Sequence, residues 1–357
     1  MKATLAIIVV AALVLIAGLA VDARSTLAAY LVAWVAIGAI PLGVLCILMT
    51  SYLVQRAWTD SLHGIMVSAT SVLPVLGVLF VPVLIGMKEL YPATEPGHAL
   101  PAFKAFYLAP LFFVLRTVIY FVVLCGLAFW QQAAWANRER MTRSASVGLI
   151  VWALVVSFAG IDWVESLEPE FHSSIYGLLY LCFTLLDGIA FAIFVGLASG
   201  RRIGATKGYS ALLLSTILLW AYLHAMQYIV IWSANIPDEA IWYLKRSSAG
   251  WQFLLAFVAL GQFVLPFFAL LNARVRSSPK WLMALCGVTV VMRCGEASIL
   301  ILPAVAQVAA VTAGLMLLAA LLLIAVILWS AFAFALRNDG RLFHSAGDRN
   351  HAEVEAR

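Results

Sequence analysis

The sequence predicts an all-α polytopic membrane protein with about ten transmembrane helices. The first observation is composition: 64% of the 357 residues are hydrophobic and 11% are charged, against about 45–50% and about 25% in soluble domains. The second is length, because the apolar residues form unbroken runs and a helix needs about 20 of them to cross the hydrocarbon core. A transmembrane β-barrel would instead show alternating segments of about ten residues. The pattern therefore excludes both a soluble fold and a membrane barrel.

Ten apolar runs follow one another along the chain, separated by short polar connections. The expected spans are 3–21, 28–54, 63–87, 108–134, 146–161, 174–198, 209–234, 250–273, 281–302 and 305–336. Together they form one integral membrane domain, residues 1–337, followed by a polar tail at 338–357. A signal peptide cleaved near Val21-Asp22-Ala23 is the alternative for the first run. That run is longer than a usual signal-peptide core, so we favour an uncleaved span.

Basic residues in the connections predict the orientation of the spans. The side of the N-terminus holds 15 of the 22 lysines and arginines, whereas the opposite side holds Arg24, Lys88, Lys104, Lys245 and Arg246. Cytoplasmic loops carry the excess of basic residues, so we expect both termini and the polar tail in the cytoplasm. The net charge of +5 follows from this bias. It also attracts the chain to the anionic lipid bilayer. It does not indicate nucleic-acid binding.

Residue types that hold redox cofactors are sparse. The five cysteines form no C-x-x-C motif, and of the six histidines only His224 lies well within an expected span. Iron–sulfur clusters need sets of cysteines, and a b-type haem in a helical bundle usually needs two facing histidines. P-loop and dinucleotide-binding fingerprints are absent from the sequence as well. We therefore expect no metal site and no covalently bound cofactor, and we place any redox centre on partner subunits.

Five ionisable residues fall inside the expected spans, where a charge is costly unless it is paired or hydrated. These proton-path candidates are Arg116, Asp187, His224, Arg293 and Glu296. Asp187 is interpreted either as part of a proton relay or as a structural hydrogen-bonding group. Arg293 and Glu296 share a helix face, so they form either a self-satisfied pair or a switchable pair beside a proton path. Arg116 is expected to pair with a carboxylate or to extend to the membrane surface.

A stripe of polar and aromatic side chains follows one face of the seventh span. Its members are Trp220, His224, Gln227 and Tyr228, which are spaced so that they point to the same side of a helix. A quinone headgroup needs hydrogen-bond donors with apolar and aromatic packing around the ring, and this stripe contains both. A seam of interhelical hydrogen bonds accounts for the same pattern. The sequence leaves both interpretations open.

Two outer loops are richer in charges and aromatic residues than a simple connection requires. The first, residues 160–174, contains Asp162, Trp163, Glu165 and Glu168, and the second, residues 232–246, contains Asn235, Glu239, Trp242 and Tyr243. We interpret these residues as surfaces that face a partner subunit. The alternative is a capped amphipathic turn at the membrane surface. The carboxylates of the first loop lack a definite metal-ligand pattern.

The same two loops carry a family resemblance. Asp162-Trp163-x-x-Ser166-Leu167-Glu168-Pro169, followed by Ser173-Ser174-Ile175-Tyr176-Gly177, resembles a signature of the F subunit of alternative complex III, a bacterial quinol oxidoreductase. Trp220-Ala221-Tyr222 and the residues up to Trp232, then Asn235-Ile236-Pro237 and Trp242-Tyr243-Leu244, are similar to a second signature of that subunit. Phe80-Val81-Pro82-Val83, Glu89-Leu90-Tyr91-Pro92 and Phe263-Val264-Leu265-Pro266 extend the resemblance over roughly residues 30–305.

The resembled family belongs to the NrfD-like membrane subunits, which implies ten helices with two four-helix bundles at the centre. It also implies an iron–sulfur/molybdopterin-like periplasmic subunit, c-type haem subunits and a second NrfD-like membrane subunit as partners in the bacterial inner membrane. The chain departs from the family pattern at Ala205-Thr206-Lys207-Gly208, which lacks the family's acid. It departs again at Glu296-Ala297, where the family has an acid followed by tryptophan.

These observations lead us to expect an integral membrane subunit of a respiratory quinol:cytochrome c oxidoreductase that is not catalytic alone. Its expected contributions are scaffold, quinone or quinol contact and proton conduction. Two alternatives stay open. One is the membrane anchor of another molybdopterin/iron–sulfur oxidoreductase of the polysulfide-reductase type. The other is a stand-alone secondary transporter, which predicts interrupted helices in two matching halves.

Overall fold

A computed structural model describes residues 2–54, 61–92, 102–135, 137–200, 206–234, 236–305 and 310–338. Within these residues the chain consists of helices and their connections and contains no strand. Ten of the described segments are long and apolar enough to cross a membrane. The predicted all-α polytopic fold is confirmed, and the chain is a multi-pass membrane protein. The predicted polar tail lies, from residue 339 on, outside the described residues.

Eight spans are continuous helices. They are α1 (Lys2–Val21), α2 (Ala23–Val54), α9 (Pro110–Ala134), α10 (Arg138–Trp163), α11 (Tyr176–Ala198), α12 (Thr206–Ala234), α17 (Pro279–Val305) and α18 (Ala310–Arg337). The largest difference from the predicted bounds is in α10, which starts eight residues earlier than expected. The Asn137 side chain caps this helix by accepting hydrogen bonds from the backbone N–H groups of Glu139 and Arg140. The cap stabilises polar turns that an apolar run does not reveal.

Two spans are built from shorter segments. The third consists of α4 (His63–Thr70), α5 (Leu73–Val78) and α6 (Val81–Ile85), and the eighth consists of α14 (Ala249–Ala259), the π-helix η3 (Leu260–Val264) and α15 (Leu265–Leu271). Prolines stand in the first turn of α5, α6 and α15, where they interrupt the preceding helix. Near these breaks in the third span, α2 binds two backbone carbonyls: Tyr30 donates to Leu79 O at 2.6 Å and Trp34 Nε1 donates to Leu76 O at 3.1 Å.

Short helices complete the connections. They are α7 (Met87–Leu90), α8 (Ala102–Tyr107), η2 (Glu165–Leu167), α13 (Pro237–Leu244) and α16 (Ala273–Arg276).

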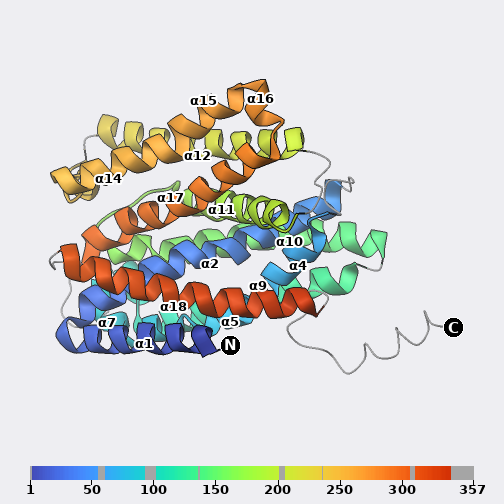
Figure 1. Cartoon of the computed structure of the whole chain (residues 1–357). Coiled ribbons are helices and arrows are strands. Elements are labelled where there is room, and N and C mark those ends of the chain that lie inside the picture. Colours follow the sequence, from blue (N-terminus) through green and yellow to red (C-terminus); the bar gives the residue numbers. More distant parts are fainter. Residues whose placement is uncertain are drawn as a thin grey trace.

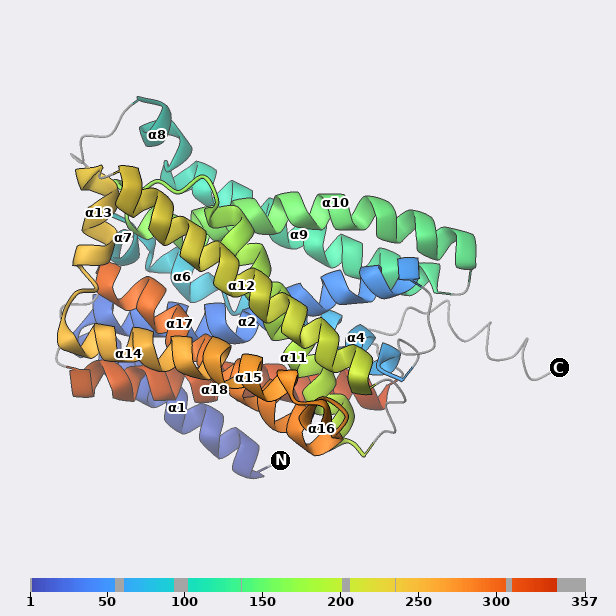
Figure 2. The same cartoon turned by 90° about the horizontal axis from the view of Figure 1, so that it is seen from above.

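Eight of the spans form two groups of four (Figure 1). In the first group, α2 and α9 each contact the third span and α10, and in the second group, α12 and α17 each contact α11 and the eighth span. The two groups meet mainly through α2 and α11, whose side chains are mostly buried. Helices α1 and α18 pack on each other and on α2, on the side of the bundle opposite α12, α14 and α15 (Figures 1 and 2).

Helices α2 and α11 cross with backbone against backbone at Gly43 and Gly188. A Cβ atom on Gly43 would collide with the carbonyl oxygen of Thr184, and one on Gly188 would stand 2.5 Å from the backbone nitrogen of Val44. Only glycine allows this approach, as at other membrane interfaces built from small residues. The crossing brings Asp187, the neighbour of Gly188, to the centre of the bundle.

Candidate functional site

Glu296 on α17 is the centre of a buried polar cluster in the second group of spans. Nε1 of Trp220 on α12 donates to both carboxylate oxygens, at 3.1 and 3.0 Å. Nη2 of Arg293, one turn away on α17, lies 2.6 Å from Oε2. Nε2 of His224 on α12 lies 3.3 Å from Oε1. The structure thus joins the predicted pair on α17 to two members of the polar stripe on α12.

The guanidinium of Arg293 is fully buried but only partly paired. Nη2 meets Glu296, whereas Nε and Nη1 have no hydrogen-bond partner among the described residues. The rings of Phe183 and Trp220 lie with their centroids 5.1 and 5.2 Å from Cζ, which adds cation–π attraction. Buried donors without partners are costly, so Arg293 keeps the capacity to bind a further acceptor.

The carboxyl of Asp187 on α11 is fully buried beside the crossing with α2. In the part of the chain that the structure describes, neither of its oxygens has a hydrogen-bond partner. Arg293 and Glu296 act on it electrostatically. An isolated carboxylate is strongly disfavoured in such surroundings, so Asp187 is either neutral or shares the charge of Arg293 with Glu296. The structural hydrogen bond that the sequence leaves open is not found among the described residues.

A cavity of about 210 Å³ adjoins this cluster. His224, Gln227 and Tyr228 of the predicted stripe form part of its wall, together with Glu296. Its other lining residues are Tyr176, Leu179, Tyr180, Phe183, Trp242, Tyr243, Leu255 and Leu300. Trp220, the remaining stripe residue, is absent from this lining and instead donates to Glu296.

Two polar groups near this cavity are unpaired. Oε1 of Gln227 and the hydroxyl of Tyr180 are buried, and neither has a hydrogen-bond partner within the described chain. Buried polar groups in proteins are normally hydrogen-bonded. The cavity therefore combines aromatic walls with polar groups that are free to bind a ligand or water.

Arg246 fixes two walls of this cavity to each other. Its guanidinium donates to the carbonyl oxygens of Trp242 at 2.7 Å, Ile299 at 2.8 Å and Leu300 at 2.9 Å. Cζ also lies 3.7 Å from the centroid of the Trp242 ring. The Ile299 carbonyl is free for this bond because Pro303, inside α17, has no N–H to donate to it. One side chain thus ties α13 to the interrupted turn of α17.

Glu168 joins this contact from the first outer loop. Its carboxylate lies 3.4 Å from Nη1 of Arg246 and 3.6 Å from Nζ of Lys245. Arg246 lies outside the membrane spans, and burial lowers its pKa while Glu168 acts in the opposite direction. The sequence places Glu168 on a partner-facing surface, whereas the structure buries it in a contact within the chain. Its charge is used to hold the loop against α13.

A second buried ion pair lies in the first group of spans. Asp162 on α10 binds Arg116 on α9 through both oxygens, at 2.7 Å from Nε and 3.0 Å from Nη2. The hydroxyl of Tyr120 donates to Asp162 at 2.6 Å, and Nη1 of Arg116 donates to the carbonyl of Tyr107 at 2.5 Å. Of the two alternatives for Arg116, the structure shows the carboxylate partner. All charged atoms of this pair are engaged.

The first outer loop starts later than the sequence predicts. Asp162 and Trp163 are expected on a partner-facing loop, but α10 continues through both residues and their side chains are fully buried. The apolar run ends at residue 161, and the Arg116–Asp162 pair lets the helix carry a buried charge at the next residue. Glu165 is half-buried and accepts a hydrogen bond from the backbone N–H of Ser173 at 2.8 Å.

The second outer loop contains the short helix α13. Asn235 lies outside the described residues, and Glu239, Trp242 and Tyr243 are half-exposed on α13. Trp242 and Tyr243 also line the cavity beside Glu296. Of the residues predicted to face a partner, these three and Glu165 keep partly exposed side chains.

Gln262 is a buried polar residue that the sequence analysis missed. It lies in η3, is fully buried, and neither polar atom of its amide has a partner among the residues that the structure describes. The π-helix packs against α17, where a Cβ on Gly261 would stand 2.5 Å from Sδ of Met292. π-Helical turns occur frequently at functional sites. An amide inside an apolar span, followed by Pro266, was the available signal.

Comparison with protein families finds no match for this chain, and no curated protein matches it as a relative. In the described ranges no three His, Cys, Asp or Glu side chains form a group that could hold a metal ion. The polar cluster around Glu296 and its adjoining cavity are the features from which a role can be argued.

Proposed function

We propose that this chain is an integral membrane subunit of a respiratory quinol:cytochrome c oxidoreductase of the alternative complex III type and is not catalytic alone. In this role it contributes a proton-accepting cluster beside a site for a quinol headgroup. Iron–sulfur/molybdopterin-like and c-type haem partners carry the electrons. The observation that supports this role is the position of Glu296 and His224, in contact with each other, in the wall of the cavity.

The residues around the cavity fit a quinol headgroup. The hydroxyls of a quinol need acceptors, and the carboxylate of Glu296 and the unpaired Oε1 of Gln227 are acceptors at this wall. Tyr180 and Phe183 present aromatic rings. The volume of about 210 Å³ is below the about 300–1,000 Å³ of pockets that enclose whole drug-sized ligands. It therefore suits a single ring whose apolar tail lies outside.

The cluster is arranged to accept and pass on a proton. Quinol oxidation releases protons together with electrons, and His224 and Glu296 are the groups placed to receive them. Arg293 and Asp187 extend the cluster from Glu296 towards the crossing of α2 and α11. A fully hydrogen-bonded network resists rearrangement. The unpaired atoms of Arg293 and Asp187 among the described residues leave this network able to rearrange.

Isolation of the complex tests the proposal. The tagged chain is extracted with a mild detergent, and the co-purifying proteins are analysed for haem and iron and assayed for quinol oxidation. We expect haem- and iron-bearing subunits to co-purify with the activity. A chain that purifies alone, without such associates, overturns the proposal. A single molybdopterin reductase as partner would assign the chain instead to the polysulfide-reductase type of anchor.

A secondary transporter is the second candidate, because two spans are interrupted at matching positions. The third and the eighth of the ten spans are built from shorter segments, so each is the third of five. Interrupted helices in corresponding halves mark the binding site of many transporters. The purified chain, reconstituted alone in liposomes, would then catalyse uptake that the Glu296→Gln variant loses. Absence of transport, together with co-purified haem subunits, decides for the first proposal.

A further inference from the structure

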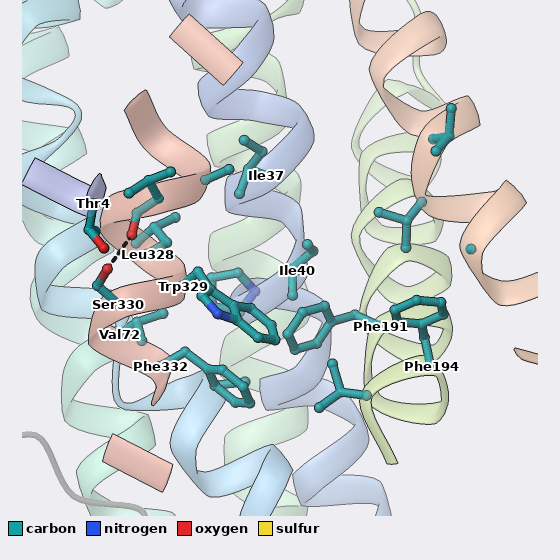
Figure 3. A pocket seen from close by; sticks show the side chains of 18 of the residues that line it. Thr4, Ile37, Ile40, Val72, Phe191, Phe194, Leu328, Trp329, Ser330 and Phe332 are labelled. Atoms are coloured by element: carbon teal, nitrogen blue, oxygen red, sulfur yellow. Dashed lines mark hydrogen bonds between the residues drawn. The ribbon is translucent and has the colours of Figure 1, made fainter. Parts of the chain in front are cut away.

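A second and larger cleft has no lining residue in common with the cavity beside Glu296. Its volume is about 810 Å³, and α1, α2, α11, α17, α18 and the third span form its walls. Phe191 of α11 lies on one side and Trp329 and Phe332 of α18 on the other, and Ile37 and Ile40 of α2 line the wall beside them (Figure 3). The rings of Phe191 and Phe332 meet edge to face at 5.5 Å.

The lining of this cleft is apolar. Its described residues carry no charge, and Thr4 and Ser330 are the two with a hydroxyl. The hydroxyl of Ser330 already donates to the carbonyl of Val326 at 2.7 Å (Figure 3). Water fills cavities that have several polar partners, whereas apolar cavities stay dry and take up apolar molecules. The chemistry of the lining therefore selects hydrocarbon.

The cleft is continuous with the surface that faces lipid. Ile7, Val291 and Trp329 line it, and they are 41%, 62% and 55% exposed. All three lie in membrane spans, so their exposed surface contacts lipid tails. A hydrocarbon chain can enter from the side without crossing the protein. The volume is within the range of about 300–1,000 Å³ that encloses most of a bound ligand.

Basic residues mark the end of the cleft where a headgroup would lie. Lys280 on α17 and Arg337 on α18 are exposed. They stand about 10 Å and about 8 Å along their helices from the lining residues Gly287 and Phe332. Cations near the membrane surface attract anionic lipid headgroups. A quinone headgroup is uncharged, so it could accept hydrogen bonds from these two residues but would lack the attraction between opposite charges that an anionic headgroup gains.

We propose that this cleft binds one acyl chain of an anionic phospholipid, with the headgroup beside Lys280 and Arg337. The bound chain packs between α2, α11, α17 and α18 and so becomes part of the interior of the bundle. The proposal does not depend on the role of the Glu296 cluster.

A matched pair of variants tests the site. Val291→Trp places a ring in the mouth of the cleft, whereas Leu318→Trp adds the same ring at a position on α18 that is 56% exposed and outside the lining. Native mass spectrometry after detergent exchange measures the phospholipid retained by the full chain. We expect the wild type and Leu318→Trp to retain one anionic phospholipid. Val291→Trp should bind this phospholipid about tenfold more weakly and retain less of it, because the added ring displaces about two methylenes of the acyl chain.

Fluorescence supplies a second measurement that adds no bulk to the cleft mouth. Phospholipids with brominated chains quench nearby tryptophans, and the difference between wild type and Trp329→Phe isolates the signal of Trp329. We expect stronger quenching of Trp329 by brominated anionic lipid than by brominated zwitterionic lipid. Equal quenching by the two, or equal lipid retention by Val291→Trp and Leu318→Trp, overturns the proposal. Stronger quenching by a brominated quinone analogue would also overturn it.

Discussion

Arg116–Asp162 and Arg293–Glu296 are both arginine–carboxylate pairs buried within the spans, and they differ in how completely they are hydrogen-bonded. In the first pair both carboxylate oxygens and all guanidinium nitrogens have partners, and Tyr120 adds a third donor. In the second pair one guanidinium nitrogen meets the carboxylate, and two have no partner among the described residues. A cavity borders the second pair through Glu296.

This difference is the basis for assigning a structural role to the first ion pair and proposing a functional role for the second. A closed set of hydrogen bonds around a buried charge leaves it no second arrangement, so its contribution is to fix α9 against α10. An incomplete set leaves polar atoms that only a proton, water or ligand can satisfy. Sequence position alone does not distinguish the two, because both arginines lie within spans.

The largest expected effect is on stability, at the closed pair. Arg116→Met leaves the Asp162 carboxylate buried without its cation, and we expect the free energy of unfolding to fall by about 3–5 kcal/mol. Denaturant unfolding in detergent measures this change. The double variant Arg116→Met/Asp162→Leu should recover most of the loss, because an apolar replacement of a whole buried pair is often neutral. An Arg116→Met variant as stable as wild type would contradict a structural role for the first ion pair.

The second effect is on turnover, at the open pair. Glu296→Gln keeps the shape of the side chain and an acceptor for Trp220 but removes the proton-accepting carboxylate. We expect the rate of quinol oxidation by the intact complex to fall about 100-fold, the lower range for loss of a general base, and the free energy of unfolding to fall as well, because the buried Arg293 loses its anionic partner. Glu139→Gln, at the exposed start of α10, is the control and should leave the rate unchanged. Full activity of Glu296→Gln would remove this cluster from the reaction.

A smaller effect on turnover is expected at Asp187. Its carboxyl has no hydrogen-bond partner within the described chain, so a substitution there breaks no such bond. Asp187→Asn should assemble normally and lower turnover or coupled proton release by about tenfold, about 1.4 kcal/mol in activation free energy. Proton release per quinol oxidised, followed with a pH indicator in vesicles, is the measurement. Unchanged oxidation and proton release would remove Asp187 from the proposed route.

The smallest effect is expected at the contact that holds the cavity walls. Arg246→Lys keeps the charge beside Glu168 but cannot reach the carbonyls of Trp242, Ile299 and Leu300 together. We expect a loss of about 1 kcal/mol in the free energy of unfolding and a raised KM for quinol with a nearly unchanged kcat. A lowered kcat with an unchanged KM would instead place Arg246 in the proton route.

The sequence predicts the ten spans well because a membrane requires long apolar runs, and this requirement is visible in one dimension. It misses features that depend on capping or on contacts between distant segments. The Asn137 cap lengthens α10 beyond its apolar run, and the prolines divide the third and eighth spans into segments. These are local events whose outcome depends on partners such as Tyr30 and Trp34 of α2.

The candidate site was predicted in part. Helical spacing places Arg293 beside Glu296 and aligns His224 with Gln227, because neighbours on one helix follow from periodicity. Spacing within a helix does not show that α12 and α17 face each other, which is what brings His224 and Trp220 to Glu296. For the same reason the partner of Arg116 was expected only as an unspecified carboxylate.

The contact between Gly43 and Gly188 has a mechanical consequence. No side chain separates α2 from α11 at this crossing, so the two helices cannot slide or separate without losing the contact between their backbones. They therefore form a rigid pair that both groups of spans share. A movement of helices that admits a substrate is then expected in the spans of each group other than α2 and α11. We expect this movement in the third and eighth spans, because each is divided into shorter helical segments.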